Sequence, residues 1–500
     1  MEKVAILLLT VVAIVVIQKI LAFVRLLRTV NHAGFRSLLT VSGISSLFPP
    51  IPLISIGNTA YEDKYKSFQR FDADIFTAVS VLPAEVNYML ADPQAIKEVV
   101  GSRVRFPKPV QLYESLMIFG SNIVASEHEE WKRYRKISGP AFTEPNNRLV
   151  WDETVKVMND LFKNIWGDKK DITLNHALEI TMPIALFIIS AAGFGRRLAW
   201  NEELKTSNGH SLTFKDALYT VSEGIRIKLL APKWAGSVFP RVKKVHGAFD
   251  ELEKYMLEMI ESRKDSEVKE QRFDLFSSLL EANDDNAEDA KLADSELLGN
   301  IFIFLIAGHE TTAHTLCFAL GLLALYPDEQ ERVYQEVLKA IPENRDPTFQ
   351  DLNGLNYVNC VLNETLRMFP PVIGIPKEAA EDCMLTTTNN AGEKVTVAIP
   401  KAKYWEDPLT FKPSRFEGDW PRDAFLPFSG GVRSCLGRRF AELESIVAIA
   451  MLVKNYKITV KEEPEFAEET FEQRKARVLK AKNGLTLTPV RTPLVFTRRD

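Results

Sequence analysis

The chain of 500 residues has little cysteine: Cys317, Cys360, Cys383 and Cys435 are its only thiols, and no two of them form a Cys-x-x-Cys pair. Sparse, widely spaced cysteines are typical of a reducing compartment and argue against a small secreted domain held by disulfides. Each cysteine therefore has to be interpreted from its own surroundings.

The chain also lacks an excess of charge of one sign, because 62 Lys and Arg stand against 66 Asp and Glu. A net charge of −4 gives no overall electrostatic footprint for nucleic acid. Neither a G-x-x-x-x-G-K-[ST] motif nor a G-x-G-x-x-G motif after a strand is present, so no nucleotide site is predicted. The hydrophobic share of 46% excludes collagen-like, wholly disordered and multi-pass membrane classes.

A strongly apolar run stands at the N-terminus. Residues 4–17 carry no charge, and the run resumes at residues 20–24 after Gln18 and Lys19. About 20 residues cross a bilayer, and no Ala-x-Ala-like cleavage site follows, so residues 1–28 are predicted to be one retained anchor rather than a cleaved signal peptide. Basic residues on its C-terminal flank predict that the body faces the cytosol.

Residues 29–53 are expected to form a linker that ends in a proline-rich elbow, and residues 54–500 are expected to form one domain. Residues 76–82 and 85–90 predict a β-hairpin. Beyond it, periodicity near 3.6 residues dominates, so the predicted fold class is mainly α with minor β. The expected helices span residues 129–144, 150–166, 178–193, 240–264, 296–326, 326–341, 355–369 and 437–455.

The longest expected helix, residues 296–326, is capped in this interpretation by Asp294 and Ser295 and would span some 45 Å, at about 1.5 Å per residue. It is apolar nearly all round, so it should be buried. Its middle reads Ala307-Gly-His-Glu-Thr-Thr312. An acid and two hydroxyls inside a buried helix are costly unless they bond locally or face a cavity.

The most informative motif is Phe428-Ser-Gly-Gly-Val-Arg-Ser-Cys-Leu-Gly437, just ahead of the last long helix. Its glycines permit tight turns, and the helix N-terminus adds positive potential, so the loop is expected to favour a thiolate at Cys435. A thiolate of this kind suits a borderline or soft metal. The alternative is that Cys435 is simply a small buried hydrophobic residue.

This motif resembles the F-x-x-G-x-R-x-C-x-G fingerprint of the cytochrome P450 superfamily at every fixed position. The resemblance implies the P450 fold and haem b, with Cys435 as the axial ligand of the iron. It also implies that Arg433 binds a haem propionate, that Phe428 packs near the sulfur, and that Gly437 belongs to the cofactor loop.

Three further motifs resemble the family in the expected order. Glu364-Thr-Leu-Arg367 with Arg415 of Pro-Ser-Arg-Phe resembles a buried Glu-Arg-Arg network with a structural role, whereas a solvated salt bridge is the alternative. Trp131 and Arg135, at i and i+4, resemble the pair that binds a haem propionate, and a core tryptophan on an amphipathic helix is the alternative.

The third motif, residues 307–312, resembles the family's oxygen-binding groove. The resemblance implies that Glu310 and Thr311 deliver protons, through water, to the oxygen that is reduced. The alternative is that the Thr311 hydroxyl bonds back to the Ala307 carbonyl and only bends the helix. A zinc site from His309 and His314 is disfavoured, because five residues place the rings about 140° apart round the helix.

The resemblance implies partners and a reaction. An NADPH-dependent flavoprotein reductase would supply electrons, docking on a basic patch. The substrate would be an apolar small molecule that is oxidised with O2, a terpenoid or another secondary metabolite, and the alternative substrates are a fatty acid or a xenobiotic. The alternative to an active enzyme is a haem-binding paralogue with impaired activity. The patch residues are Lys132, Arg133, Lys136, Arg438 and Arg439. Expected pocket residues are Phe302, Ile303, Ala307, Val372, Ile373 and 121–124.

The chain most resembles fungal microsomal members of the family, which implies the endoplasmic reticulum membrane and a cytosolic catalytic domain. Lys377 stands where the family often has a propionate-binding arginine. One departure is that Lys401 and Ala402 run directly into Lys403, where members usually have a further strand and a short helix. A gene-model error, a splice form and a real deletion would all produce this sequence.

Overall fold

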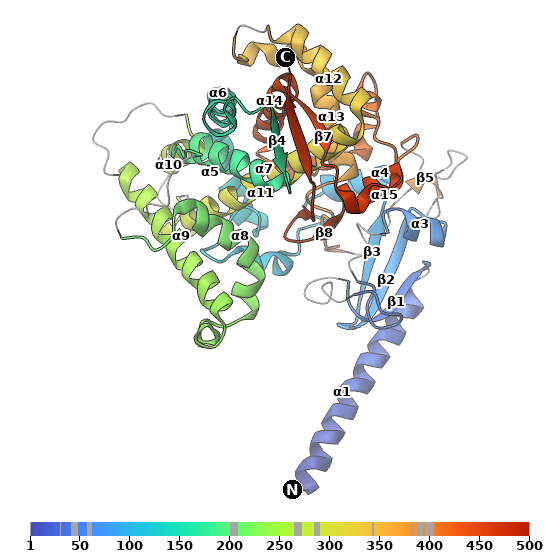
Figure 1. Cartoon of the computed structure of the whole chain (residues 1–500). Coiled ribbons are helices and arrows are strands. Elements are labelled where there is room, and N and C mark those ends of the chain that lie inside the picture. Colours follow the sequence, from blue (N-terminus) through green and yellow to red (C-terminus); the bar gives the residue numbers. More distant parts are fainter. Residues whose placement is uncertain are drawn as a thin grey trace. The chain divides into compact units, whose positions relative to one another are not determined.

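A computed structural model describes most of the chain (Figure 1), and its described residues form two compact units. The described residues are 2–30, 32–41, 49–57, 63–200, 209–264, 273–284, 291–342, 345–381, 385, 387–388, 394–395 and 405–499. Unit 1 comprises Met1–Leu112, Ile373–Thr410 and Pro421–Ser434, and unit 2 comprises Tyr113–Val372, Phe411–Trp420 and Cys435–Asp500. The segment at Lys401–Lys403 and the thiol of Cys383 lie outside the described residues.

Unit 1 contains a three-stranded sheet in the order β1-β2-β3, and the expected hairpin is confirmed. Strand β2 (Ile75–Leu82) pairs antiparallel with β3 (Glu85–Leu90) and parallel with β1 (Gly34–Leu39). A Cβ on Gly34 would lie 1.8 Å from the Thr77 carbonyl oxygen, so β1 reaches β2 because residue 34 has no side chain. Residues expected to be a linker thus contribute a strand.

The apolar N-terminal run forms the helix α1 (Glu2–Thr29), which extends away from the β1-β2-β3 sheet (Figure 1). Its segment Leu9–Thr29 has a mean hydropathy of 2.2 and no buried share. The Thr10 hydroxyl donates to the Ile6 carbonyl oxygen, so this polar group is satisfied within the helix. A long helix with apolar side chains exposed all round is consistent with a membrane anchor.

Unit 1 also holds short elements around the cofactor-loop sequence. Helix α4 begins after Asp92, whose carboxylate accepts from the Ala95 N–H, and Pro93 occupies its first turn. The 3-10 turn η11 packs against α4. The elements are α3 (Lys66–Phe71), α4 (Pro93–Gly101), β5 (Thr387–Thr388), β6 (Lys394–Val395), η10 (Arg422–Ala424) and η11 (Gly431–Arg433).

Unit 2 is mainly helical, and several expected helices are confirmed to within about two residues. The confirmed ones are α7 with η5 (Leu178–Ile188, Ile189–Gly193), α9 (Pro240–Lys264), α11 (Asp294–Leu325), α12 (Pro327–Ala340), α13 (Asn356–Met368) and α14 (Arg438–Asn455). The sequence interpretation missed α8 (Phe214–Leu230), α10 (Leu275–Asp284) and α15 (Phe471–Val478). It also missed the small sheet β4 (Asp171–Leu174), β10 (Leu494–Arg498), β7 (Tyr456–Val460) and the hairpin β8 (Ala481–Asn483), β9 (Leu487–Pro489).

Two expected boundaries were wrong. The helix expected over 129–144 ends early, as α5 (His128–Ser138) and a 3-10 turn, and α6 (Glu144–Asp160) starts six residues before the expected 150. The cause is local: the Thr143 hydroxyl accepts from the Asn146 N–H, and Pro145 fits the first turn of a helix.

Helix α11 lies at the core of unit 2, in contact with α7, α13 and α14, and its burial is confirmed. The expected cap was wrong. Ala293 is the N-cap residue, and the Glu296 carboxylate accepts its N–H at 2.8 Å, because a glutamate in the first turn can reach back to this donor. A Cβ on Gly299 would lie 2.5 Å from the carbonyl oxygens of Gly120 and Ser121, so the helix start touches this loop directly.

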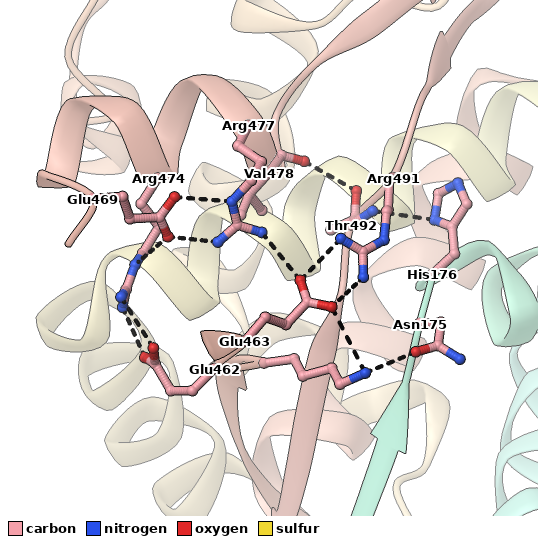
Figure 2. A network of polar contacts seen from close by, with 11 residues as sticks. Asn175, His176, Glu462, Glu463, Glu469, Arg474, Arg477, Val478, Arg491 and Thr492 are labelled. Carbon is pink, nitrogen blue, oxygen red and sulfur yellow. Dashed lines mark hydrogen bonds and ion pairs between the residues drawn. The ribbon is translucent and has the colours of Figure 1, made fainter. Parts of the chain in front are cut away.

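The chain after α14 is held by a network of charged side chains (Figure 2). Glu463 pairs with Arg491 and Arg477, and Glu469 with Arg474 and Arg477. The carboxylates of Glu463 and Glu469 are mostly buried, and their arginine partners lower the pKa of both.

The same region is tied to the segment before α7. The Thr492 hydroxyl donates to the Val478 carbonyl oxygen at 3.1 Å, and the Thr492 N–H donates to His176 Nδ1 at 3.3 Å (Figure 2). Val478 precedes the hairpin β8–β9 in the sequence and Thr492 follows it, so these contacts anchor both ends of the hairpin.

We expect Gly299→Ala to lower the midpoint of thermal unfolding, because overpacking against backbone costs about 1–3 kcal/mol. Gly247→Ala is the matched control, since a Cβ at this position in α9 meets nothing within 4 Å. The control should be neutral or stabilising by up to about 1 kcal/mol, because alanine is the better helix former. Far-UV circular dichroism of both variants tests this, and equal midpoints would contradict the close approach.

Candidate functional site

Cys435 lies at the start of α14 in unit 2, two residues before the N-cap Gly437. It is exposed, whereas Cys317 and Cys360 are buried, and burial raises the pKa of those two thiols to about 12 and about 11. Their chemistry is that of small core residues. Cys435 is thus the exposed residue among the described cysteines, although protein lies close to its sulfur.

Opposing effects act on the Cys435 thiol. The protein packed round the sulfur desolvates it and raises its pKa, while the Gly437 N–H and the charges of Arg135 and Arg438 lower it. The net direction is upward, so the expectation that the loop alone favours a thiolate was wrong. A metal ion would be the group that keeps this sulfur deprotonated.

Helix α5 carries Trp131 and Arg135 near this thiol. Trp131 is buried and Arg135 is half-buried. Burial lowers the pKa of Arg135, and the charge of Cys435 raises it. Contact of both side chains with a propionate stays a prediction.

Beyond its exposed first turn, helix α11 is buried except for the half-buried Ala324 and one stripe in its middle. Ala307 is exposed, and Phe304, Gly308 and Thr311 are half-buried, although the helix around them is buried. These positions are three or four apart and therefore share one face. The Thr311 hydroxyl donates to the Ala307 carbonyl oxygen at 2.8 Å, so the local back-bond considered from the sequence is present. A flat apolar group could lie along this open stripe.

Two expected pocket residues lie elsewhere. Phe302 and Ile303 are 0% and 3% exposed, and Phe302 packs edge-on against Phe119 at 4.9 Å. The structure therefore places Phe304 on the open stripe in their stead. Val372 is exposed, and residues 121 and 124 are half-buried. Ile373 is half-buried in unit 1.

Glu310 is buried on α11 and is held by a residue far along the chain. Thr486 Oγ1, at the tip of the β8–β9 hairpin, donates to Glu310 Oε1 at 2.8 Å. Burial raises the pKa of Glu310, and the Thr486 hydrogen bonds oppose that rise. Sequence reasoning missed Thr486 because it lies 176 residues from Glu310, and a single threonine in a turn carries no motif.

Glu444 is a second buried acid that was missed. It lies on α14 with no exposed surface, and burial raises its pKa well above the usual range, while the Thr312 hydroxyl lowers it. Burial thus favours the protonated form of this acid over the carboxylate. Its only sequence signal was its position on the buried face of the predicted helix.

The network around Glu364 is confirmed as a buried one. Glu364 is fully buried; its oxygens accept from Arg367 Nε at 2.7 Å and from Arg415 Nε at 3.0 Å. The Lys412 N–H also donates to it, at 2.9 Å. Helix α13 is thereby fixed to the segment around η9 (Pro413–Phe416), and the alternative of a solvated surface pair is wrong.

The remaining expected cofactor residues belong to unit 1. Phe428, Arg433 and Lys377 are half-buried there. Gly431 has φ +63°, and a Cβ on it would lie 2.6 Å from the Val100 carbonyl oxygen, so this turn requires glycine. The roles of the three side chains toward a cofactor stay predictions.

The basic patch is only partly available. Arg133 is bonded to Glu296, which accepts two of its N–H groups, and to the Lys291 carbonyl oxygen, so its charge is largely compensated, and its part in the patch stays a prediction. Arg438 pairs with Glu442 at 2.8 Å, and Arg439 lies 3.7 Å from the same carboxylate. Four of the five residues are exposed, namely Lys132, Lys136, Arg438 and Arg439.

Within the described part of the chain, no three His, Cys, Asp or Glu side chains are arranged to hold a bare metal ion. His309 bonds to Leu305 O and Ser222 Oγ, and His314 to Thr486 Oγ1. An exposed thiol and an apolar open stripe instead suit a large cofactor that brings its own metal.

Comparison with known proteins decides the family. The sequence model described as Cytochrome P450 matches residues 51–487. The chain belongs to the cytochrome P450 family. It is 52% identical to "Cytochrome P450 monooxygenase 124" of Postia placenta over 488 residues, covering 94% of each chain. It is also 28% identical to "Cytochrome P450 monooxygenase AOL_s00215g278" of Arthrobotrys oligospora, over 83% of this chain and 82% of that protein.

A solved structure supports the fold. "Crystal structure of cytochrome P450DA heme domain" aligns with a TM-score of 0.70 at 21% identity, over 89% of this chain and 94% of that one. The expected P450 fold is confirmed, and the chain is a P450 monooxygenase with a haem-thiolate cofactor and O2 as co-substrate. The exposed Cys435 thiol and the open stripe of α11 fit haem.

We expect Glu364→Gln to destabilise the protein by about 3–5 kcal/mol, because it leaves two buried arginines without their carboxylate. The matched control is Glu417→Gln, which removes the partner of Arg332 in an ion pair that is about half exposed on both sides. The control should cost about 0.2–1 kcal/mol. Thermal unfolding of the two variants compares them, and a similar loss in both would contradict the importance of burial.

Proposed function

We propose that this P450 oxidises an apolar small molecule, a terpenoid or another secondary metabolite, using electrons from an NADPH-dependent flavoprotein reductase. The observation that carries the apolar substrate is the open stripe of α11, where Phe304 and Ala307 offer carbon surface beside Thr311. The named fungal relatives are monooxygenases, which supports the comparison with fungal metabolism. Fatty-acid or xenobiotic oxidation is the second candidate, on the same apolar surface.

Haem held in this site would supply the activation of O2 and the oxidation of the substrate. Cys435 would hold its iron through the thiolate, and Trp131, Arg135 and Arg433 would donate hydrogen bonds to its propionates. Phe428 and Gly437 complete the loop around the sulfur. Glu364, Arg367 and Arg415 support this region structurally by holding α13 in place.

Glu310 and Thr311 are proposed to handle protons. The Thr311 hydroxyl lies on the open stripe, where it can bond to a water or to oxygen, and its back-bond to Ala307 holds it in place. Glu310 has a raised pKa because it is buried, so it can hold a proton closer to neutral pH than an ordinary glutamate. Adjacent residues of a helix point about 100° apart, so the proposal is that water carries the proton from Glu310 to the side that Thr311 faces.

A further proposal concerns which membrane α1 enters and on which side of it the catalytic body lies. We propose that α1 places the protein in the endoplasmic reticulum membrane by a single pass, with the catalytic body in the cytosol. The basic residues 25 and 28 at the C-terminal end of α1 and residue 36 beyond it support this orientation. The reductase is proposed to dock on the exposed side chains of Lys132, Lys136, Arg438 and Arg439. A haem-binding paralogue without turnover is the alternative to an active enzyme.

We expect the reduced protein treated with carbon monoxide to show the red-shifted Soret band of thiolate-ligated haem, and Cys435→Ala to abolish it. Cys360→Ala is the control, because that thiol is buried in the core of α13. Mass spectrometry of extracts from hosts that express either variant then identifies the substrate. A metabolite oxidised in both hosts would argue against oxidation by this protein, and an unaltered spectrum in Cys435→Ala would overturn the ligand assignment.

We expect Thr311→Ala to uncouple NADPH consumption from product, since a positioned proton donor contributes about 10²–10⁴-fold. The yield of product per NADPH should fall by about tenfold or more, with peroxide formed in its place. Thr311→Ser keeps the hydroxyl and should retain coupling. The measurement is the ratio of product to NADPH with reductase present, and an unchanged ratio in Thr311→Ala would contradict the assigned role.

A further inference from the structure

The hairpin β8–β9 reaches the proton-handling region with the side chain of Thr486. Thr486 stands between β8 and β9 and is buried, and the Gly484 N–H donates to the Thr486 carbonyl oxygen at 2.9 Å, which closes the tip. The Leu487 N–H donates to the Pro371 carbonyl oxygen at 2.8 Å, so the residue after Thr486 is fixed to the end of the α13 segment. The tip therefore has a defined position relative to α11.

Two residues of α11 bond to this one hydroxyl. Glu310 Oε1 and His314 Nδ1 each lie 2.8 Å from Thr486 Oγ1. Glu310 and His314 are four residues apart, so they lie on one face of the helix, one turn from each other. A threonine hydroxyl has one proton to donate.

The direction of these bonds follows from that single proton. When Glu310 is a carboxylate, it can only accept, so the Thr486 proton points toward Glu310. His314 Nδ1 must then carry the proton and donate to Thr486 Oγ1, which assigns the Nδ1–H tautomer. The resulting chain runs from His314 through Thr486 to Glu310.

We propose that Thr486 is a positioning residue for Glu310, and that His314 fixes the direction of the Thr486 hydroxyl. The proposal rests on the proton-handling role proposed above for Glu310 and extends it to the hairpin. Without Thr486, the buried carboxylate would lose its bonded partner on Oε1, while Oε2 already has no hydrogen bond among the described residues.

The charges around the chain are consistent with this role. Burial raises the pKa of Glu310, the Thr486 bonds act in the opposite direction, and the charge of Glu223 on α8 adds to the rise. Burial and the neighbouring His309, His176 and Lys482 lower the pKa of His314 to about 3, so its imidazole stays neutral. A neutral ring donates one hydrogen bond and adds no charge that would hold Glu310 permanently ionised.

The test is the pKa of Glu310 in the full-length, haem-loaded protein, read from the infrared carbonyl band of its protonated acid during a pH titration. Glu310→Gln identifies the band by removing it. We expect Thr486→Val to raise this pKa by about 1–2 units, because a hydrogen bond to a charged group is lost. His314→Leu should give a smaller rise, and Thr486→Ser should restore the original titration.

Thr154→Val is the matched control. Its hydroxyl is also fully buried, but it bonds to the Val150 carbonyl oxygen within α6. The Glu310 band should titrate in this variant as it does in the unaltered protein. Where the valine variant of Thr486 does not accumulate as folded protein, Thr486→Ala is used in the same way.

An unshifted Glu310 band in Thr486→Val or Thr486→Ala would overturn the positioning role. A shifted band, with the pH profile of the product-to-NADPH ratio moved in the same direction, supports both the positioning role and the role of Glu310. A shifted band with an unchanged ratio supports the positioning role and contradicts proton handling by Glu310. The two proposals therefore fail separately.

Discussion

Burying a polar group on a helix costs free energy unless the group finds a partner or an opening, and most polar side chains in the middle of α11 find one, with Glu310 Oε2 as an exception among the described residues. The Asn300 amide oxygen accepts from the Ile123 N–H, and His309 bonds to Leu305 and Ser222. Glu310 and His314 share Thr486. Only the stripe at Ala307 opens, so the same packing that buries the helix defines where a cofactor and a substrate can lie.

The chain buries carboxylates in two different ways. Glu364 is held as an ion by two arginines and a backbone N–H, which makes it a structural joint. Glu310 and Glu444 are buried without an arginine or lysine partner, and burial raises the pKa of both. The first arrangement joins two segments of the chain by ion pairs. The second leaves a buried acid that can exchange a proton, so the first serves structure and the second serves proton transfer.

Much of this was accessible from the sequence, for definite physical reasons. Helix α9 was predicted to the residue and α13 to within one, because their apolar periodicity is strong, and Glu364, Arg367 and Arg415 were recognised because they belong to a motif. Thr486 and the tautomer of His314 could not be predicted, since they depend on a hairpin folding back over 176 residues. The net rise of the Cys435 pKa was also out of reach, because desolvation depends on packing and not on neighbours in sequence.

The charged network of Figure 2 has a consequence for the hairpin that it encloses. Its central carboxylates, Glu463 and Glu469, are 12% and 8% exposed, whereas Glu462 at its edge is 71% exposed. Dissolved ions screen exposed pairs much more than enclosed ones, so added salt would weaken the edge and leave the centre intact. The hairpin holds the buried Glu310 through Thr486, so the position of this carboxyl group should change little with the ionic strength of the solution.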